Sequence, residues 1–146
     1  MSMRARALCA LAAACLLAGC ATPTPFTPAA VRFARVDYLK DGPSSAEALA
    51  KADAPGILLR LDRDTVSPTD EFVASVIIEP ARVGRKLSAR LTIIRGDDLE
   101  RARLDIPDVR STRLDVHVEL RGAAPGPYLL RVEMDGVTDD KLFTVR

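Results

Sequence analysis

The single histidine of this 146-residue chain lies among acidic side chains at a regular spacing. Asp115, His117 and Glu119 alternate with apolar residues, so they share one face of an expected strand. An imidazole beside carboxylates could transfer protons. However, no recognised motif places a Ser or Cys nucleophile beside His117, and one histidine cannot form a histidine-rich metal site. We interpret the three side chains as the solvated face of a sheet and predict no catalytic residue, no metal and no cofactor.

Arginine makes up most of the basic residues, and three arginines fall on neighbouring segments of the expected sheet, namely Arg90, Arg101 and Arg103. A guanidinium group binds carboxylates and phosphates through two parallel hydrogen bonds. A sheet face that carries these arginines could bind an acidic partner, lipid phosphates or peptidoglycan carboxylates. The favoured interpretation is an ordinary surface on which the arginines pair with carboxylates of the same chain.

The overall charge argues against a nucleic-acid partner. The chain has 21 Lys and Arg against 20 Asp and Glu, which gives a formal net charge of +1. Nucleic-acid binding needs a concentrated basic face to neutralise phosphates, and the sequence shows neither the excess nor the clustering. With 48% hydrophobic and 28% charged residues, the composition is that of a globular domain.

The N-terminal residues have the layout of a signal peptide. Arg4 and Arg6 precede an apolar run over residues 7–18. This run is shorter than the roughly 20 residues that a permanent transmembrane helix requires. Two of the three cysteines, Cys9 and Cys15, would leave with residues 1–19, so the mature chain would retain only Cys20 and form no internal disulfide.

The run ends in Leu17-Ala18-Gly19-Cys20, which resembles the lipobox of bacterial lipoproteins at all four positions. The resemblance implies that the thiol of Cys20 receives a diacylglyceryl group, that a peptidase removes residues 1–19, and that the new amine is acylated. Because lipid chains of this kind hold a protein firmly on a bilayer, we expect an envelope protein anchored to a membrane at Cys20. In this family Asp after the cysteine marks inner-membrane retention, so Ala21 implies the outer membrane, with the domain facing the periplasm.

A lead-in segment over residues 20–55 is expected between the anchor and the domain. Pro23, Pro25 and Pro28 favour an extended tether, which would span about 30 Å at about 3.1 Å per residue. A short strand is plausible within residues 31–39. Ser44 and Glu47 have the spacing of a capping box, which predicts one or two helical turns before Pro55.

Residues 56–146 are predicted to form one all-β domain. About seven short segments alternate apolar and polar residues, without helix-length apolar periodicity between them: 57–62, 72–78, 87–93, 102–106, 114–120, 128–134 and 143–145. Antiparallel strands with one apolar face each must bury those faces against one another, which favours two packed sheets. We predict an immunoglobulin-like sandwich, with a small open barrel or a transthyretin-like sandwich as alternatives.

The last 22 residues resemble the closing hairpin of bacterial immunoglobulin-like and fibronectin type III-like domains. A strand with Gly126 and Tyr128 returns through Asp135-Gly136 into a strand with Phe143 and Val145. The resemblance implies that Tyr128 is a corner tyrosine whose hydroxyl bonds nearby backbone. The chain has no tryptophan and no cysteine pair for a core, so the kinship is with disulfide-free domains.

Two smaller features remain open at this point. We interpret Asp139-Asp140 as a polar decoration of the final hairpin. Val73, Ile77 and Ile94 fall on nominally polar strand faces, which indicates either a surface for a partner or strands covered by the lead-in segment.

These observations favour a membrane-anchored binding or scaffolding module without catalytic activity, which would contact another envelope protein. A periplasmic chaperone, or an inhibitor of a protease or hydrolase acting through residues 80–85 or 122–127, is the alternative. An enzyme is the least favoured class because no nucleophile is paired with a base.

Overall fold

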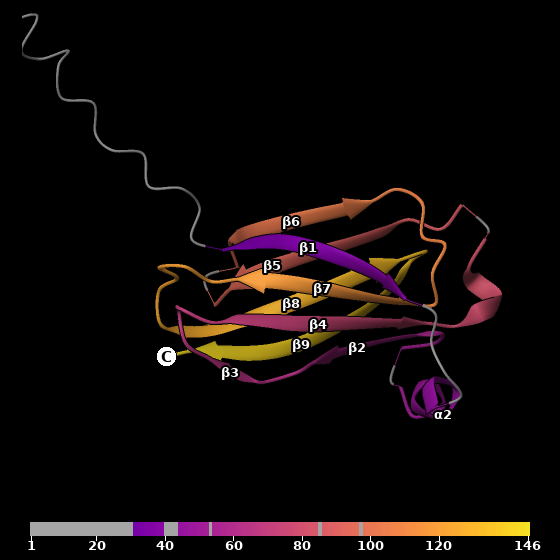
Figure 1. Cartoon of the computed structure of the whole chain (residues 1–146), viewed down its shortest axis with the longest axis horizontal. Coiled ribbons are helices and arrows are strands. Elements are labelled where there is room, and N and C mark those ends of the chain that lie inside the picture. The colour runs from indigo at the N-terminus through magenta and orange to yellow at the C-terminus, as the bar shows by residue number, and fades with distance from the viewer. Residues whose placement is uncertain (1–30, 40–43, 53, 85, 97) are drawn as a thin grey trace, which may run out of the picture.

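The computed structural model describes residues 31–39, 44–52, 54–84, 86–96 and 98–146. They form two facing β-sheets and one short helix, α2 (Ser44–Ala50) (Figure 1). In chain order the strands are β1 (Arg32–Leu39), β2 (Ile57–Leu61), β3 (Thr65–Val66), β4 (Glu71–Ile78), β5 (Ala89–Arg95), β6 (Glu100–Ile106), β7 (Arg113–Glu119), β8 (Gly126–Met134) and β9 (Val137–Val145). The predicted all-β sandwich is confirmed.

The strand order is that of an immunoglobulin-type sandwich. One sheet has the order β1-β7-β4-β2 and the other has the order β3-β9-β8-β5-β6. The trios β2-β4-β7 and β9-β8-β5 correspond to strands A, B, E and G, F, C of the immunoglobulin fold, and β1 occupies the fourth position beside β7. Neighbouring strands are antiparallel except for β3, which runs parallel to β9.

All seven predicted strands are present, and two further strands complete the sheets. β1 was expected only as part of the lead-in, but its seven register pairs with β7 make it an edge strand of the sandwich. The sandwich therefore begins before the predicted boundary at residue 56, because β7 would otherwise present an unpaired edge. β3 has two residues, which is too short for an alternating pattern to reveal.

The core lies between the inner faces of the two sheets. Along β7 the predicted apolar face is buried, with Leu114, Val116 and Val118 fully removed from solvent. Phe143 packs against Phe72 and Tyr128, at ring-centroid distances of 4.8 and 5.4 Å. The Tyr128 hydroxyl donates a hydrogen bond to the Ala124 carbonyl at 2.8 Å, so the predicted corner tyrosine is confirmed.

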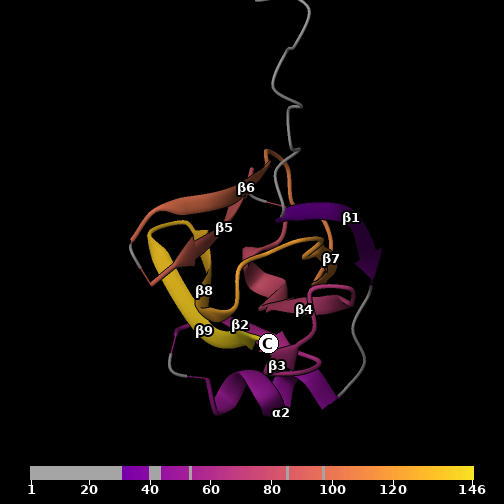
Figure 2. The ribbon, with the colours of Figure 1, turned by 90° about the vertical axis from the view of Figure 1, so that its left-hand side faces the viewer.

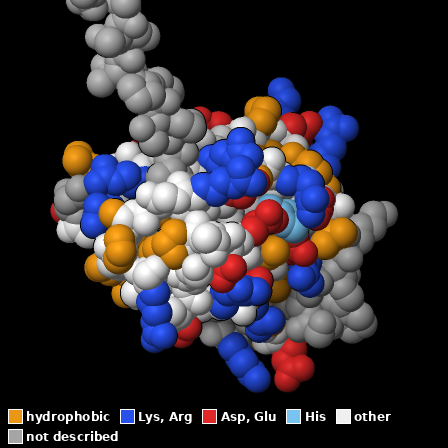
Figure 3. Space-filling view, turned by 60° about the vertical axis from the view of Figure 1, so that its left-hand side comes forward, with side chains coloured by type: hydrophobic (Ala, Val, Ile, Leu, Met, Phe, Trp, Pro, Cys, Tyr) orange, Lys and Arg blue, Asp and Glu red, His pale blue; other side chains and the backbone are white. Residues whose placement is uncertain are grey.

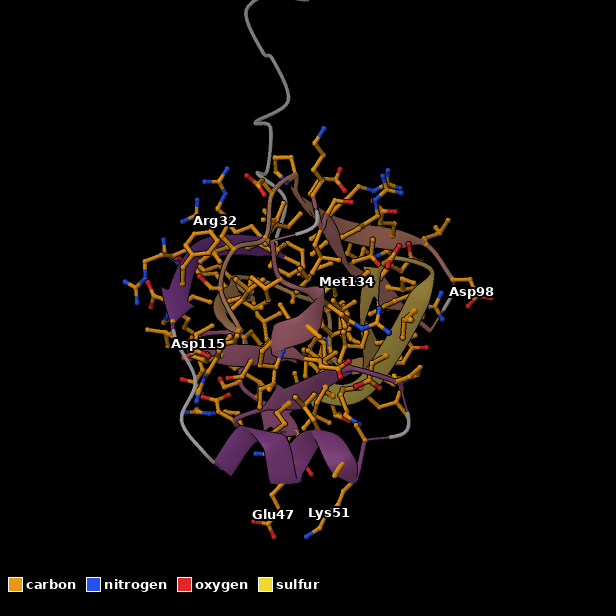
Figure 4. The ribbon with its side chains drawn as sticks, turned by 90° about the vertical axis from the view of Figure 1, so that its right-hand side faces the viewer. Arg32, Glu47, Lys51, Asp98, Asp115 and Met134 are labelled. Carbon is orange, nitrogen blue, oxygen red and sulfur yellow. The ribbon has the colours of Figure 1, made fainter. Side chains whose placement is uncertain are left out.

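The helix α2 packs on the sandwich beside the four-stranded sheet. It contacts β2 and β4, and Figure 2 shows it lying below β2. Ile77, on the outer side of β4, is buried, and α2 contacts this strand, which agrees with cover by the lead-in segment. Glu47 of α2 and Lys51, which directly follows the helix, point away from the sheets (Figure 4), with Lys51 Nζ 3.7 Å from Glu47 Oε1. No helix among the described residues is long and apolar enough to cross a bilayer.

Candidate binding surface

The predicted lipidation site, Cys20, lies outside the described residues. The two outer sheet faces carry the other candidate residues, which are His117, Arg90 and Arg103.

Two of the three predicted partner-binding arginines lie on the outer face of β5 and β6. Arg90 is opposite Asp105 in the register and donates to its Oδ1 from Nε at 2.7 Å. Arg103 lies two residues before Asp105 and so shares its side of the sheet. Arg101 lies at a bulge, between Ala102 and Glu100, where the register shifts. We call the surface around Arg90 and Arg103 the arginine face.

Carboxylates of the same chain engage both arginines of this face. Arg103 donates two hydrogen bonds of 2.8 Å to the carboxylate of Glu100. These bonds, and the negative charge of Glu100, raise the pKa of Arg103 above its ordinary value. All four side chains are more than a third exposed. Such exposed pairs contribute about 0–1 kcal/mol each, so a partner's carboxylates can exchange with them at little cost.

The same sheet has an uncovered apolar corner, formed by Ile94, Pro127, Leu129 and Leu142. Ile94 is opposite Leu129, which is opposite Leu142, so three apolar side chains form one cross-strand row. Leu142 is 71% exposed. The corner borders a shallow hollow of about 400 Å³ that Arg95 and Arg131 also line. Ile94 thus belongs to a surface that no described segment covers.

The outer face of the four-stranded sheet holds His117 in a cluster that the sequence did not predict. Its Nδ1 lies 2.6 Å from Glu71 Oε1 on β4, and its Nε2 lies 2.9 Å from Asp37 Oδ2 on β1. The side chain is 14% exposed. In Figure 3 the histidine is seen among acidic and basic side chains. The partners of His117 come from neighbouring strands and not from its own strand.

The protonation of His117 decides which residue of β1 it bonds. The hydrogen bond to Glu71 requires a proton on Nδ1, and the one to Asp37 requires a proton on Nε2, because carboxylates only accept. Arg35 Nη2 lies 3.0 Å from Nε2 and can donate to it only when Nε2 carries no proton. Arg35 and Asp37 both belong to β1, so His117 links β4 to β1 in either state.

Asp115 belongs to a second group on β7. Its Oδ1 accepts from Ser75 at 2.8 Å and from Arg113 at 2.9 Å. Burial raises the pKa of Asp115, but the bonds from Arg113 and Ser75, with the charges of Arg113 and His117, outweigh it and hold the pKa below its ordinary value. Glu119 is bonded by Arg32 at 2.6 Å, which also lowers its pKa. Asp115 and Glu119 are thus engaged by other partners than His117.

The sequence matches no family model and no curated protein. Similar solved structures include the following two. The Pseudomonas fluorescens alkylpurine DNA glycosylase AlkC, bound to DNA with an abasic site analogue, is 14% identical with a TM-score of 0.48; the match covers 69% of this chain and 32% of that chain, so this chain spans about a third of its length. The soluble domain of PmoD from Methylocystis sp. ATCC 49242 is 20% identical with a TM-score of 0.45, covering 62% of this chain and 90% of that chain.

The comparisons give no support to the prediction that the chain is not an enzyme, since the first of these structures is itself a DNA glycosylase. At such identities and TM-scores, neither similarity carries an argument about what this chain binds or does. Among the described residues, no group of three or more His, Cys, Asp or Glu side chains is arranged to hold a metal ion.

Proposed function

We propose that the chain is an envelope lipoprotein, anchored at Cys20, whose sandwich binds another envelope protein through the arginine face. The anchor is supported by the four-residue match to the lipobox and by the apolar run that precedes it. The absence of Asp at residue 21 favours the outer membrane, with the sandwich in the periplasm.

One observation carries the choice of surface. The arginine face presents two exposed guanidinium groups on adjacent strands, each held by a carboxylate of the same chain. The strands fix the spacing of the two groups, so the face presents two guanidinium groups, each able to form two parallel hydrogen bonds, in a defined arrangement. On binding, the carboxylates of an acidic partner would take the place of Asp105 and Glu100 beside the two arginines. The spacing of the arginines would then select the partner, although the net change in free energy at each pair is small.

Two measurements test the proposal. Mass spectrometry of the mature N-terminal peptide tests the anchor. We expect a diacylglyceryl group on Cys20 in the parent chain and none in the Cys20→Ser variant. A photo-crosslinking residue at Ser88 tests the surface, because Ser88 is exposed and lies two residues before Arg90 on the same side of the chain. We expect a discrete protein adduct in intact envelopes.

The control position is Lys51, which is also exposed but directly follows α2, the helix that packs on the other sheet. A crosslinker there is expected to give no such adduct. The double variant Arg90→Glu and Arg103→Glu is expected to abolish the adduct from residue 88, whereas Arg110→Glu, an exposed arginine outside this face, is expected to retain it. Equal adducts from both positions, or an adduct that is insensitive to the double variant, would contradict the proposed surface.

A further inference from the structure

We propose that the apolar corner contacts the phospholipid surface to which the chain is anchored. This inference rests on the proposed lipid anchor at Cys20. It concerns a different surface from the arginine face, because Arg90 is near the start of β5 and Ile94 is near its end.

The topology places the apolar corner at the end of the sandwich where β1 begins. Arg32, the first residue of β1, is opposite Glu119, the last residue of β7. The short loop after β7 leads directly to Gly126, which begins β8 and is opposite Val145 at the end of β9. Figure 1 shows the start of β1 and the C-terminus at the same end.

The length of chain before β1 limits how far this end can lie from the bilayer. Residues 21–31 separate Cys20 from β1, and so few residues reach at most about 35–40 Å even when fully extended. The opposite end of the sandwich lies farther away by the length of a strand, which is about 25 Å for eight residues. Of the two ends, the one with the apolar corner is therefore the one that the anchor presents to lipid.

The side chains at this end suit a phospholipid surface. Leu142 and Leu99 are 71% and 59% exposed, the two highest values among the exposed large hydrophobic residues. Arg95 lines the same hollow as Leu142, where it also lies over the Tyr128 ring and donates to the Pro125 carbonyl. Arg121 lies at the same end of the sandwich, in the loop after β7, and is exposed. Both cations are at the end that would meet lipid phosphates. Figure 3, which brings this end forward, shows hydrophobic side chains gathered next to basic ones.

Three acidic side chains at this end are engaged by arginines, while the exposed Asp98 lines the hollow itself. Glu100 is bonded by Arg103, and Glu119 by Arg32. Asp70 lies 3.7 Å from Arg63. Pairing with arginine reduces the repulsion between these carboxylates and anionic lipid headgroups. The apolar corner thus has basic residues around it, an arrangement that is also found in segments that bind membrane surfaces.

Single tryptophan reporters test the contact, because the chain has no tryptophan of its own. The lipidated mature chain is reconstituted in vesicles of phosphatidylethanolamine and phosphatidylglycerol, with and without brominated acyl chains that quench tryptophan. Leu142→Trp is expected to lose most of its emission in brominated vesicles. Tyr38→Trp, a matched control that is 55% exposed at the opposite end of β1, is expected to keep its emission.

Circular dichroism and the unfolding midpoint confirm that each variant is folded, and mass spectrometry confirms the lipid on Cys20. Lipidated, folded Leu142→Trp that is not quenched would overturn the inference and leave the proposed anchor intact. Equal quenching at residues 142 and 38 would also overturn it, as would shielding of residue 142 only when envelope proteins are added. A chain without lipid at Cys20 would overturn the anchor, and the inference with it.

Discussion

The carboxylate of Asp139 on β9 accepts a hydrogen bond of 2.8 Å from the backbone N–H of Leu59 on β2. The two strands belong to different sheets, and β2 is an edge strand. The other carboxylate oxygen accepts from the N–H of Asp140 at 3.0 Å. Asp139 therefore satisfies an edge donor that no strand reaches, and it joins the two sheets along one side of the sandwich. Its interpretation as a surface decoration of the final hairpin is wrong.

Replacement of Asp139 is expected to destabilise the fold. Asp139→Ala leaves the N–H of Leu59 buried without an acceptor, which costs about 1–3 kcal/mol. Asp139→Asn keeps one carbonyl oxygen and can retain only one of the two bonds, so its loss is expected to be smaller. Urea unfolding measures both free energies. The control is Asp135→Asn, a highly exposed carboxylate in the β8–β9 turn, for which a loss as large as that of Asp139→Ala would contradict the explanation.

His117→Ala is expected to loosen β1 more than the rest of the fold. The imidazole bonds Glu71 on β4 and either Asp37 or Arg35 on β1. Its removal deletes these hydrogen bonds, which is expected to lower the free energy of unfolding by about 1–2 kcal/mol. Hydrogen exchange should therefore accelerate in the amides of β1 and change little in β8, at the centre of the other sheet.

His117→Gln supplies a control for this prediction, since an amide can still donate to one carboxylate and is expected to restore part of the protection. A uniform acceleration across both sheets in His117→Ala would show that the imidazole contributes to general stability and not to the attachment of β1.

The strands of the sandwich were predictable because alternation is a local property. β7 shows this most clearly: Leu114 to Leu120 alternate without interruption, and every second residue is buried. The cluster at His117 was not predictable, because it depends on the registers of the two strands beside β7. Arg35 of β1 lies opposite His117 on one side, and Val73 of β4 lies opposite it on the other. A register between strands some 80 residues apart leaves no trace in a local pattern.

Asp139 shows a second limit of sequence reasoning. It has the inward parity of Phe143 and Val145, and a polar residue at an inward position was a usable signal that it has a buried partner. The partner itself, the N–H of Leu59, is a backbone group and is invisible in a sequence. The arginine face was predictable in part: strand parity placed Arg90 and Arg103 together, and the bulge at Arg101 was not foreseen.

The environment of Asp115 predicts a specific loss of stability in acid. Its pKa in the folded chain lies below the unfolded value, so its contribution is fully present above about pH 4 and is lost as the pH falls through the folded pKa. Urea midpoints measured at decreasing pH should fall less steeply for Asp115→Asn than for the parent. Asp98→Asn, at an exposed turn, serves as the control, and an equal change of slope in both variants would exclude a special role for Asp115.

Gly56 is expected to tolerate a side chain less well than Gly84, because Arg82 lies across it. Gly56 has φ +78°, and a Cβ there would lie 2.3 Å from Arg82 Nε and 2.7 Å from Glu79 Oε2. Gly84 has φ +92° but open space around it, so it bears the same backbone strain without the clash. Gly84→Ala is expected to cost about 1–2 kcal/mol from strain alone, and Gly56→Ala to cost more by the energy of displacing Arg82.

The Arg82 guanidinium also donates to the Pro55 carbonyl at 2.9 Å, so its displacement breaks a bond that holds the chain entering β2. The double variant Gly56→Ala with Arg82→Ala separates the two contributions. If the clash is responsible, the second substitution should cost less in the Gly56→Ala background than in the parent, because Arg82 has already been displaced there. Free energies of unfolding from urea titrations of the four proteins give this coupling, and strictly additive losses would show that Gly56 is required for its backbone conformation and not for the approach of Arg82.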